Sequence, residues 1–286
     1  MRLIFLISIA MLAFAANSVL CRLALKETAI DAASFTLVRV LSGALVLCLL
    51  VAGQQHLANK KAALGGNWVS AAALFLYAAC FSFSYISLPT GTGALLLFGT
   101  VQLCMISYGV FQGETYNLVQ KLGSLLAILG LVVLLLPGIS APPLVGSLLM
   151  VLAGVGWGVY SLRGKGSTDP SSDTAGNFLR ATPFCIALSL VAMVGTSLDT
   201  LGLWYAVLSG ALASGLGYAI WYAALPLIKS TTAATVQLSV PVIAAFAGVI
   251  FLAEPLDARL VIAALGILGG IMLVLTNNEI KRGAIK

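Results

Sequence analysis

The chain has 286 residues, of which 60% are hydrophobic and only 8% are charged, and its mean hydropathy is +1.08. Soluble domains carry roughly 25% charged residues, so this composition excludes a soluble domain and predicts an integral membrane protein. The apolar runs are continuous and lack the alternating pattern of barrel strands, which favours helices. The net charge of +6 comes from basic residues at segment ends and does not indicate nucleic-acid binding.

Ten segments have the length and apolar character of membrane-spanning helices, which need about 20 apolar residues. They are 3–25, 33–53, 67–88, 91–112, 117–137, 143–163, 176–196, 201–225, 230–252 and 258–277. The connections between them are short, so we expect consecutive helices to be antiparallel neighbours. Small residues at helical spacing, such as Gly154, Gly156 and Gly266-xxx-Gly270, predict close helix crossings within one chain.

The positive charges predict the orientation, because lysine and arginine accumulate at cytoplasmic helix ends. With the N-terminus inside, the cytoplasmic ends hold Arg2, Lys60, Lys61, Lys121, Arg163, Lys165, Arg180, Lys229, Lys281, Arg282 and Lys286. The outer ends hold Arg22, Lys26, Arg39 and Arg259. This bias predicts that both termini are cytoplasmic.

Weak internal similarity divides the chain into two halves, 1–140 and 141–286, with five predicted helices each. For example, Phe111–Glu114 resembles Phe251–Glu254 at an offset of 140 residues. Because five is odd, the second half must enter the membrane the opposite way up. Inverted repeats of this kind are typical of secondary transporters, with the substrate site near the membrane midplane.

Several features together resemble the drug/metabolite transporter superfamily. They are the two five-helix halves, Trp157-Gly158 late in the first helix of a half, an arginine opening the second helix of each half (Arg39 and Arg180), Pro241 within a helix, and Glu254 thirteen residues later. Within the superfamily the chain is most similar to the EamA-like family, and there to bacterial aromatic amino acid exporters. It departs from the usual pattern at Asn17-Ser18, where Trp-Gly is common, and at Val101, where the repeat predicts proline.

The resemblance implies an all-α membrane protein with ten transmembrane helices, arranged as two inverted five-helix EamA-like repeats around a central cavity. It implies export of amino acids, aromatic or otherwise apolar, and related metabolites across the bacterial inner membrane by alternating access. The expected partners are a small-molecule substrate and the lipid bilayer, with no nucleic acid and no cofactor, and the chain is expected to act as a monomer. The alternatives are a multidrug exporter of lipophilic cations and a non-transporting membrane scaffold or receptor.

Aromatic and amide side chains within the predicted helices are the expected substrate-binding residues. They are Asn17, Tyr77, Tyr85, Gln102, Trp157, Tyr160, Tyr218, Trp221, Tyr222 and Gln237. Their rings suit a flat or apolar solute through stacking or cation–π contact. The alternatives are ordinary helix packing for the rings and interhelical hydrogen bonds for the amides.

Prolines at helix breaks are the expected hinges, namely Pro89, Pro226 and Pro241. Thr90–Gly93 predicts a tight turn that starts a helix, with anion binding by its N–H groups as the alternative. No carboxylate falls at mid-membrane, which disfavours a cation carrier and favours facilitated or weakly coupled movement.

Glu114 and Glu254 are the possible coupling residues, and the alternative is that they cap helices or pair with Lys121 and Arg259. No catalytic motif is present, the single histidine lies in a polar loop, and the five cysteines lack CxxC spacing. The sequence therefore predicts neither an enzyme nor a metal site.

Overall fold

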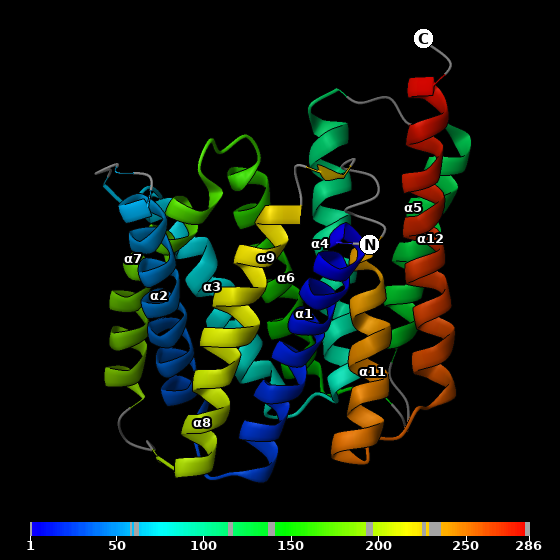
Figure 1. Cartoon of the computed structure of the whole chain (residues 1–286). Helices are drawn as coiled ribbons and strands as arrows, with labels where there is room; N and C mark the ends of the chain where they lie inside the picture. Colours follow the sequence, from blue (N-terminus) through cyan, green and yellow to red (C-terminus); the bar gives the residue numbers. More distant parts are fainter. Residues whose placement is uncertain are drawn as a thin grey trace.

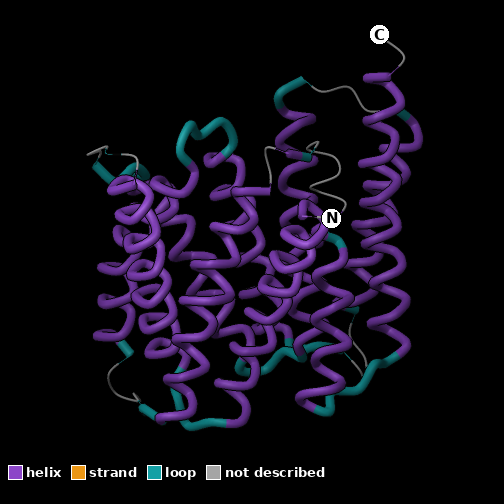
Figure 2. The backbone as a smooth tube through the Cα atoms, in the orientation of Figure 1, coloured by secondary structure: helices purple, strands orange, loops and turns teal. Residues whose placement is uncertain are grey.

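The computed structural model describes residues 2–57, 59, 63–113, 117–136, 141–192, 197–224, 227–228 and 236–283, and this part of the chain is helical with short connections (Figure 2). The helices are α1 (Arg2–Glu27), α2 (Ala32–Leu57), α3 (Trp68–Tyr85), α4 (Thr90–Phe111), α5 (Leu118–Leu135), α6 (Leu144–Gly164), α7 (Pro170–Val191), α8 (Thr200–Leu208), α9 (Gly217–Ala224), α11 (Ser239–Leu252) and α12 (Ala258–Gly283) (Figure 1). A π-helical segment, Ser209–Leu216, joins α8 to α9.

Eight helices in the described part of the chain are long and apolar enough to cross a membrane. One of them is the continuous stretch Thr200–Ala224, which contains α8, the π-helical segment and α9. The other described helices are α7, whose first turns are polar, and α11, which has only 14 residues. The chain is therefore a multi-pass membrane protein, and the count of ten spans stays a prediction.

Helices that follow one another in the sequence run in opposite directions, but they are not the main packing partners (Figure 1). The most extensive contacts join α5 with α12, α3 with α6, and α2 with α7. In addition, α4 packs on α6 and α11, while α1 packs on α11 and on the α8–α9 stretch. The expectation that consecutive helices are the main neighbours is therefore wrong, although α2 and α3 do pack together, because the largest contacts join helices from opposite halves of the chain.

Glycines permit the closest of these crossings. A Cβ atom added to Gly270 of α12 would lie 2.6 Å from the backbone nitrogen of Ala127 in α5. A Cβ atom added to Gly156 of α6 would lie 2.9 Å from the backbone nitrogen of Tyr77 in α3. No side chain fits at these distances, so the backbones approach as in other small-xxx-small contacts. The close approach of α6 to α3 also brings Tyr77 and Trp157 together.

Candidate functional site: a central cavity

A cavity of about 280 Å³ lies among the helices, near the lower end of the range of roughly 300–1,000 Å³ for ligand pockets. Its wall comes from α1, α3, α4, α6, the π-helical segment with α9, and the turn before α11. The lining residues are Phe14, Asn17, Ser18, Tyr77, Phe81, Leu97, Phe98, Val101, Gln102, Met105, Trp157, Ser161, Gly164, Lys165, Ala213, Tyr218, Trp221, Tyr222, Ile228 and Gln237. None of these residues is acidic.

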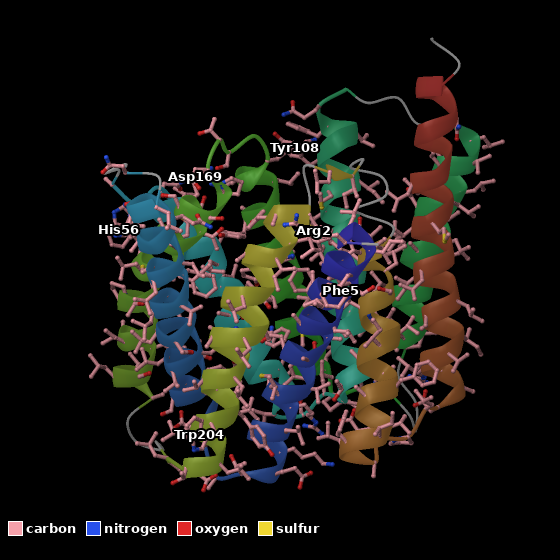
Figure 3. The ribbon with its side chains drawn as sticks, in the orientation of Figure 1. Arg2, Phe5, His56, Tyr108, Asp169 and Trp204 are labelled. Carbon is pink, nitrogen blue, oxygen red and sulfur yellow. The ribbon has the colours of Figure 1, made fainter. Side chains whose placement is uncertain are left out.

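The cavity opens toward the end of the bundle where α6 leads into α7. Its wall there includes Gly164 and Lys165, which are exposed at the C-terminal end of α6. Asp169, in the following loop, lies at the upper end of the molecule in Figure 3, whereas Trp204 lies at the lower end.

Trp157 is the centre of the aromatic wall. The centroid of its ring system lies 5.0 Å from that of Tyr77 and 5.2 Å from that of Tyr218, which it stacks on at an interplanar angle of 29°. Phe14 meets Tyr218 edge-on at 5.7 Å and Trp221 edge-on at 6.0 Å. Rings from four helical segments therefore present faces and edges that can hold a flat apolar group.

Asn17 connects three parts of the wall. Its Nδ2 donates to the Tyr77 hydroxyl at 3.1 Å, and its Oδ1 accepts from the Ser209 hydroxyl at 2.6 Å. Both ends of the amide thus make the interhelical hydrogen bonds that the sequence left as an alternative to substrate binding. Gln102 and Gln237 supply two further amides to the wall.

Of the sequence-predicted substrate residues, only Tyr85 and Tyr160 do not line the cavity. Tyr85 is fully buried below it, where its hydroxyl donates to the Thr90 carbonyl at 3.3 Å. Tyr160 donates to the Thr174 hydroxyl at 3.3 Å, in a smaller pocket of about 30 Å³ that Tyr222 also lines.

Sequence reasoning missed three phenylalanines of the wall, Phe14, Phe81 and Phe98. Apolar residues in apolar helices carry no polarity signal of their own. Helical spacing could have found all three, because each stands three or four residues from a predicted site residue: Phe14 before Asn17, Phe81 after Tyr77 and Phe98 before Gln102.

The predicted hinges fall in different settings. Pro89 is the N-cap residue of α4, and Pro226 lies outside the described residues. Pro241 is the third residue of α11 rather than a mid-helix residue, because the helical path is interrupted at Leu238. Since proline has no N–H, Pro241 cannot bond to the carbonyl of Gln237, four residues earlier, and this break lies beside the cavity.

An ion pair closes the lower end. Arg22 Nε donates to Glu254 Oε1 at 3.2 Å, and Arg22 Nη1 donates to the carbonyls of Tyr85 and Ile86 at 2.8 Å each. Glu254 Oε2 accepts from the backbone N–H of Thr90 at 2.7 Å, at the N-terminus of α4. The network therefore joins α1, α3, α4 and the end of α11 one helical turn beyond Ser18.

This network changes two expectations from the sequence. The partner of Glu254 is Arg22 and not Arg259, which donates to the carbonyl of Leu136 instead. The first N–H group of the turn at Thr90 is bound by Glu254, so it does not face a solute. Glu114 lies outside the described residues.

Membrane-length helices around an aromatic and amide-lined cavity define a multi-pass membrane protein with a site of solute size, as a membrane transporter requires. The comparisons with known proteins agree. Residues 144–276 match the EamA-like transporter family. The uncharacterized protein PA1977 of Pseudomonas aeruginosa is 55% identical over 275 residues, which is 96% of this chain and 94% of that protein. The match to the EamA-like transporter family covers a little under half of the chain and supports its placement in the drug/metabolite transporter superfamily.

Two more distant similarities extend over nearly the whole chain. An uncharacterized transporter of Archaeoglobus fulgidus is 26% identical over 283 residues, covering 94% of this chain and 95% of that protein. A crystal structure described only as that of a protein aligns with a TM-score of 0.65 at 17% identity, over 96% of both chains. At this identity the second similarity establishes the fold alone.

Proposed function

We propose that the protein exports amino acids with aromatic or other apolar side chains, and related metabolites, across the bacterial inner membrane by alternating access. The observation that carries this proposal is the cavity itself. Rings stacked around Trp157 offer flat apolar surfaces, and the amides of Gln102 and Gln237 stand beside them. Such a wall suits a solute that has both an apolar side chain and hydrogen-bonding groups.

The proposal includes two inverted repeats, residues 1–140 and 141–286. The repeats relate five pairs of helices: α1 and α6, α2 and α7, α3 and α8–α9, α4 and α11, and α5 and α12. Exchanging the two members of every pair maps the main contacts between helices onto one another. The pairs α5–α12, α2–α7 and α4–α11 map onto themselves, while α3–α6 maps onto α1 with α8–α9. The contact α4–α6 likewise maps onto α1–α11. This two-fold pattern supports the inverted arrangement.

The unequal ends of the cavity support alternating access. The open end adjoins the loop that carries Asp169. The distribution of positive charges in the sequence predicts that this loop and both termini are cytoplasmic. The closed end is held by the pair of Arg22 and Glu254. Transport requires this pair to separate while the other end closes, with Pro89, Pro226 and Pro241 as the proposed hinges.

Among the described residues of the cavity wall none is acidic, which weighs against the alternative, a multidrug exporter of lipophilic cations. A cation taken out of water needs a negative partner. Glu254 does not supply it, because its two oxygens are bound by Arg22 and by the N–H of Thr90. Because both oxygens of Glu254 are already bound, we assign this residue a role in gating the closed end of the cavity rather than in coupling transport to an ion.

The experiment is calorimetric binding of phenylalanine, tryptophan, threonine and a lipophilic dication to the purified protein. We expect the two aromatic amino acids to bind, and Trp157→Leu to weaken that binding at least tenfold, or about 1.4 kcal/mol, through the lost ring contacts. Trp204→Leu is the matched control, because Trp204 is 61% exposed at the opposite end of the bundle. Binding of the dication alone would support drug export and overturn the proposal.

A further inference from the structure

Arg39 is a charged side chain buried within the bundle without an acidic partner among the described residues. It is only 2% exposed. Its Nη2 donates to the carbonyl of Ala78 at 3.1 Å, and its Nη1 has no hydrogen-bond partner. The guanidinium carbon faces three rings, at 4.9 Å from the centroid of Phe81, 5.6 Å from that of Tyr77 and 6.0 Å from that of Phe35.

The packing compensates this charge only in part, through one hydrogen bond and three ring contacts. The sequence placed Arg39 among the residues at the outer helix ends, but it stands two turns inside α2, where its burial is costly. Arg180, at the matching place in the second half of the chain, is a useful contrast. It is half-buried, and its Nη1 donates to the carbonyls of Gly65 and Gly176, at 2.6 and 2.9 Å. Cation–π contacts offset only part of the cost for Arg39.

Only one layer of side chains separates Arg39 from the cavity. The rings of Tyr77 and Phe81 face the guanidinium and also belong to the cavity wall. A group touching the far side of such a ring lies roughly 9 Å from the charge, since the ring adds about 4 Å of van der Waals contact to about 5 Å. At an effective dielectric constant of about 20, a unit charge at that distance changes affinity on the order of twenty-fold.

The other charges near the cavity do not cancel this field. Lys165, at the open end, is also positive. Glu254 is neutralised by Arg22 at the closed end. Asp173 lies in the smaller neighbouring pocket, where it accepts from the N–H of Gly66 at 2.7 Å. The described part of the cavity wall therefore has a positive potential with no negative group of its own.

We propose that Arg39 determines charge selectivity, so that the cavity favours a solute with a carboxylate, or another anionic group, attached to a flat apolar body. This inference rests on the proposed function and narrows its substrate class. The rings around Trp157 hold the apolar body, and the anionic group lies toward Tyr77 and Phe81. Arg39 acts through its field across these rings, as a positioning residue that does not touch the solute.

The test compares three ligands that share one ring: 3-phenylpropionate, phenethylamine and phenylalanine. Their affinities are measured by calorimetry on the full-length protein and on Arg39→Gln, Arg39→Lys and Arg180→Gln. The readout is the ratio of the affinities for phenylpropionate and phenethylamine on the same folded sample, which a loss of stability alone does not change. We expect a ratio of at least ten in the unmodified protein.

Arg39→Gln should lower that ratio on the order of twenty-fold through the lost attraction for phenylpropionate alone, and by more because the repulsion of phenethylamine is lost as well. Arg39→Lys, which keeps the charge, and the control Arg180→Gln should retain the ratio. Equal affinity for the two ligands in the unmodified protein, or an unchanged ratio in Arg39→Gln, overturns the inference and leaves the proposed function standing. If Arg39→Gln does not fold, a preference of the unmodified protein for phenethylamine still overturns it. Binding of none of the three ligands overturns the proposed function, and this inference with it.

Discussion

Replacing Glu254 with glutamine should open the closed end of the cavity. The carboxylate is 8% exposed and its partner Arg22 is 10% exposed, with 3.2 Å between Nε and Oε1. Removing one partner of a buried ion pair costs about 3–5 kcal/mol, because the remaining charge stays buried without compensation. If the pair exists only in the state that is closed at this end, about 3 kcal/mol shifts the ratio of the two states on the order of 150-fold.

The assay starts from a Ser18→Cys variant and labels the introduced thiol with a membrane-impermeant maleimide added outside intact cells. Ser18 lies in the cavity wall, one turn before Arg22, so the reagent reaches this position from that side only when the closed end opens. The background lacks the five native cysteines, Cys21, Cys48, Cys80, Cys104 and Cys185. We expect Glu254→Gln to raise the labelling rate at least tenfold.

The matched control is Glu27→Gln, which removes the same charge near the same end. Glu27 pairs with Lys26 at 3.2 Å but is 50% exposed, so its loss should change little. A labelling rate at position 18 that stays unchanged in Glu254→Gln, together with a lower melting temperature, would refute the gating role and make the pair structural.

Two further predictions concern stability, measured by thermal unfolding in detergent. Gly270→Ala should destabilise the protein by about 1–3 kcal/mol, because the added methyl group meets the backbone of α5, whereas Gly269→Ala, with nothing within 4 Å, should stabilise it by about 0.5–1 kcal/mol. Asp31→Ala should cost about 1 kcal/mol, because the carboxylate caps α2 by accepting from the N–H groups of Ala33 and Ser34. Although partial burial alone would raise the pKa of Asp31, hydrogen bonds, chiefly from Ser34, outweigh it and lower this pKa.

The lowered pKa fixes the sign of the pH dependence. A carboxyl group whose folded-state pKa is depressed stabilises the protein above its unfolded pKa, and the contribution is lost as the pH falls through the folded value. The difference in stability between the unmodified protein and Asp31→Ala should therefore shrink below about pH 4. A difference that grows toward low pH would contradict this assignment, and equal effects of Gly269→Ala and Gly270→Ala would contradict the close crossing of α5 and α12.

Much of the cavity could be predicted from the sequence, because amide and aromatic side chains inside apolar helices are a visible signal. The depth of a side chain along its helix was harder to predict than the helix face on which it lies. Tyr77, Phe81 and Tyr85 stand four residues apart on one face of α3, and Tyr85 falls outside the wall only because it lies below the floor of the cavity. Tyr160, three residues beyond Trp157, likewise falls in the smaller pocket.

Long-range pairing could not be predicted. Arg22 and Glu254 are separated by 232 residues, and no local pattern links them. The offset of 140 residues between the halves pairs Arg22 with Leu162, so symmetry offered no hint of the ion pair. Counting positive charges also placed Arg39 at a helix end, because a charge count does not measure depth along the helix. Both residues became interpretable only through contacts between helices distant in the sequence.

The most direct measurement is flux of labelled phenylalanine in proteoliposomes that contain the purified protein, with no imposed ion gradient. Export of apolar amino acids by a facilitative route predicts saturable flux that unlabelled tryptophan inhibits and a lipophilic dication does not. Flux of the dication without flux of phenylalanine would contradict the proposed substrate class, and absence of any flux would contradict transport of these solutes through the cavity.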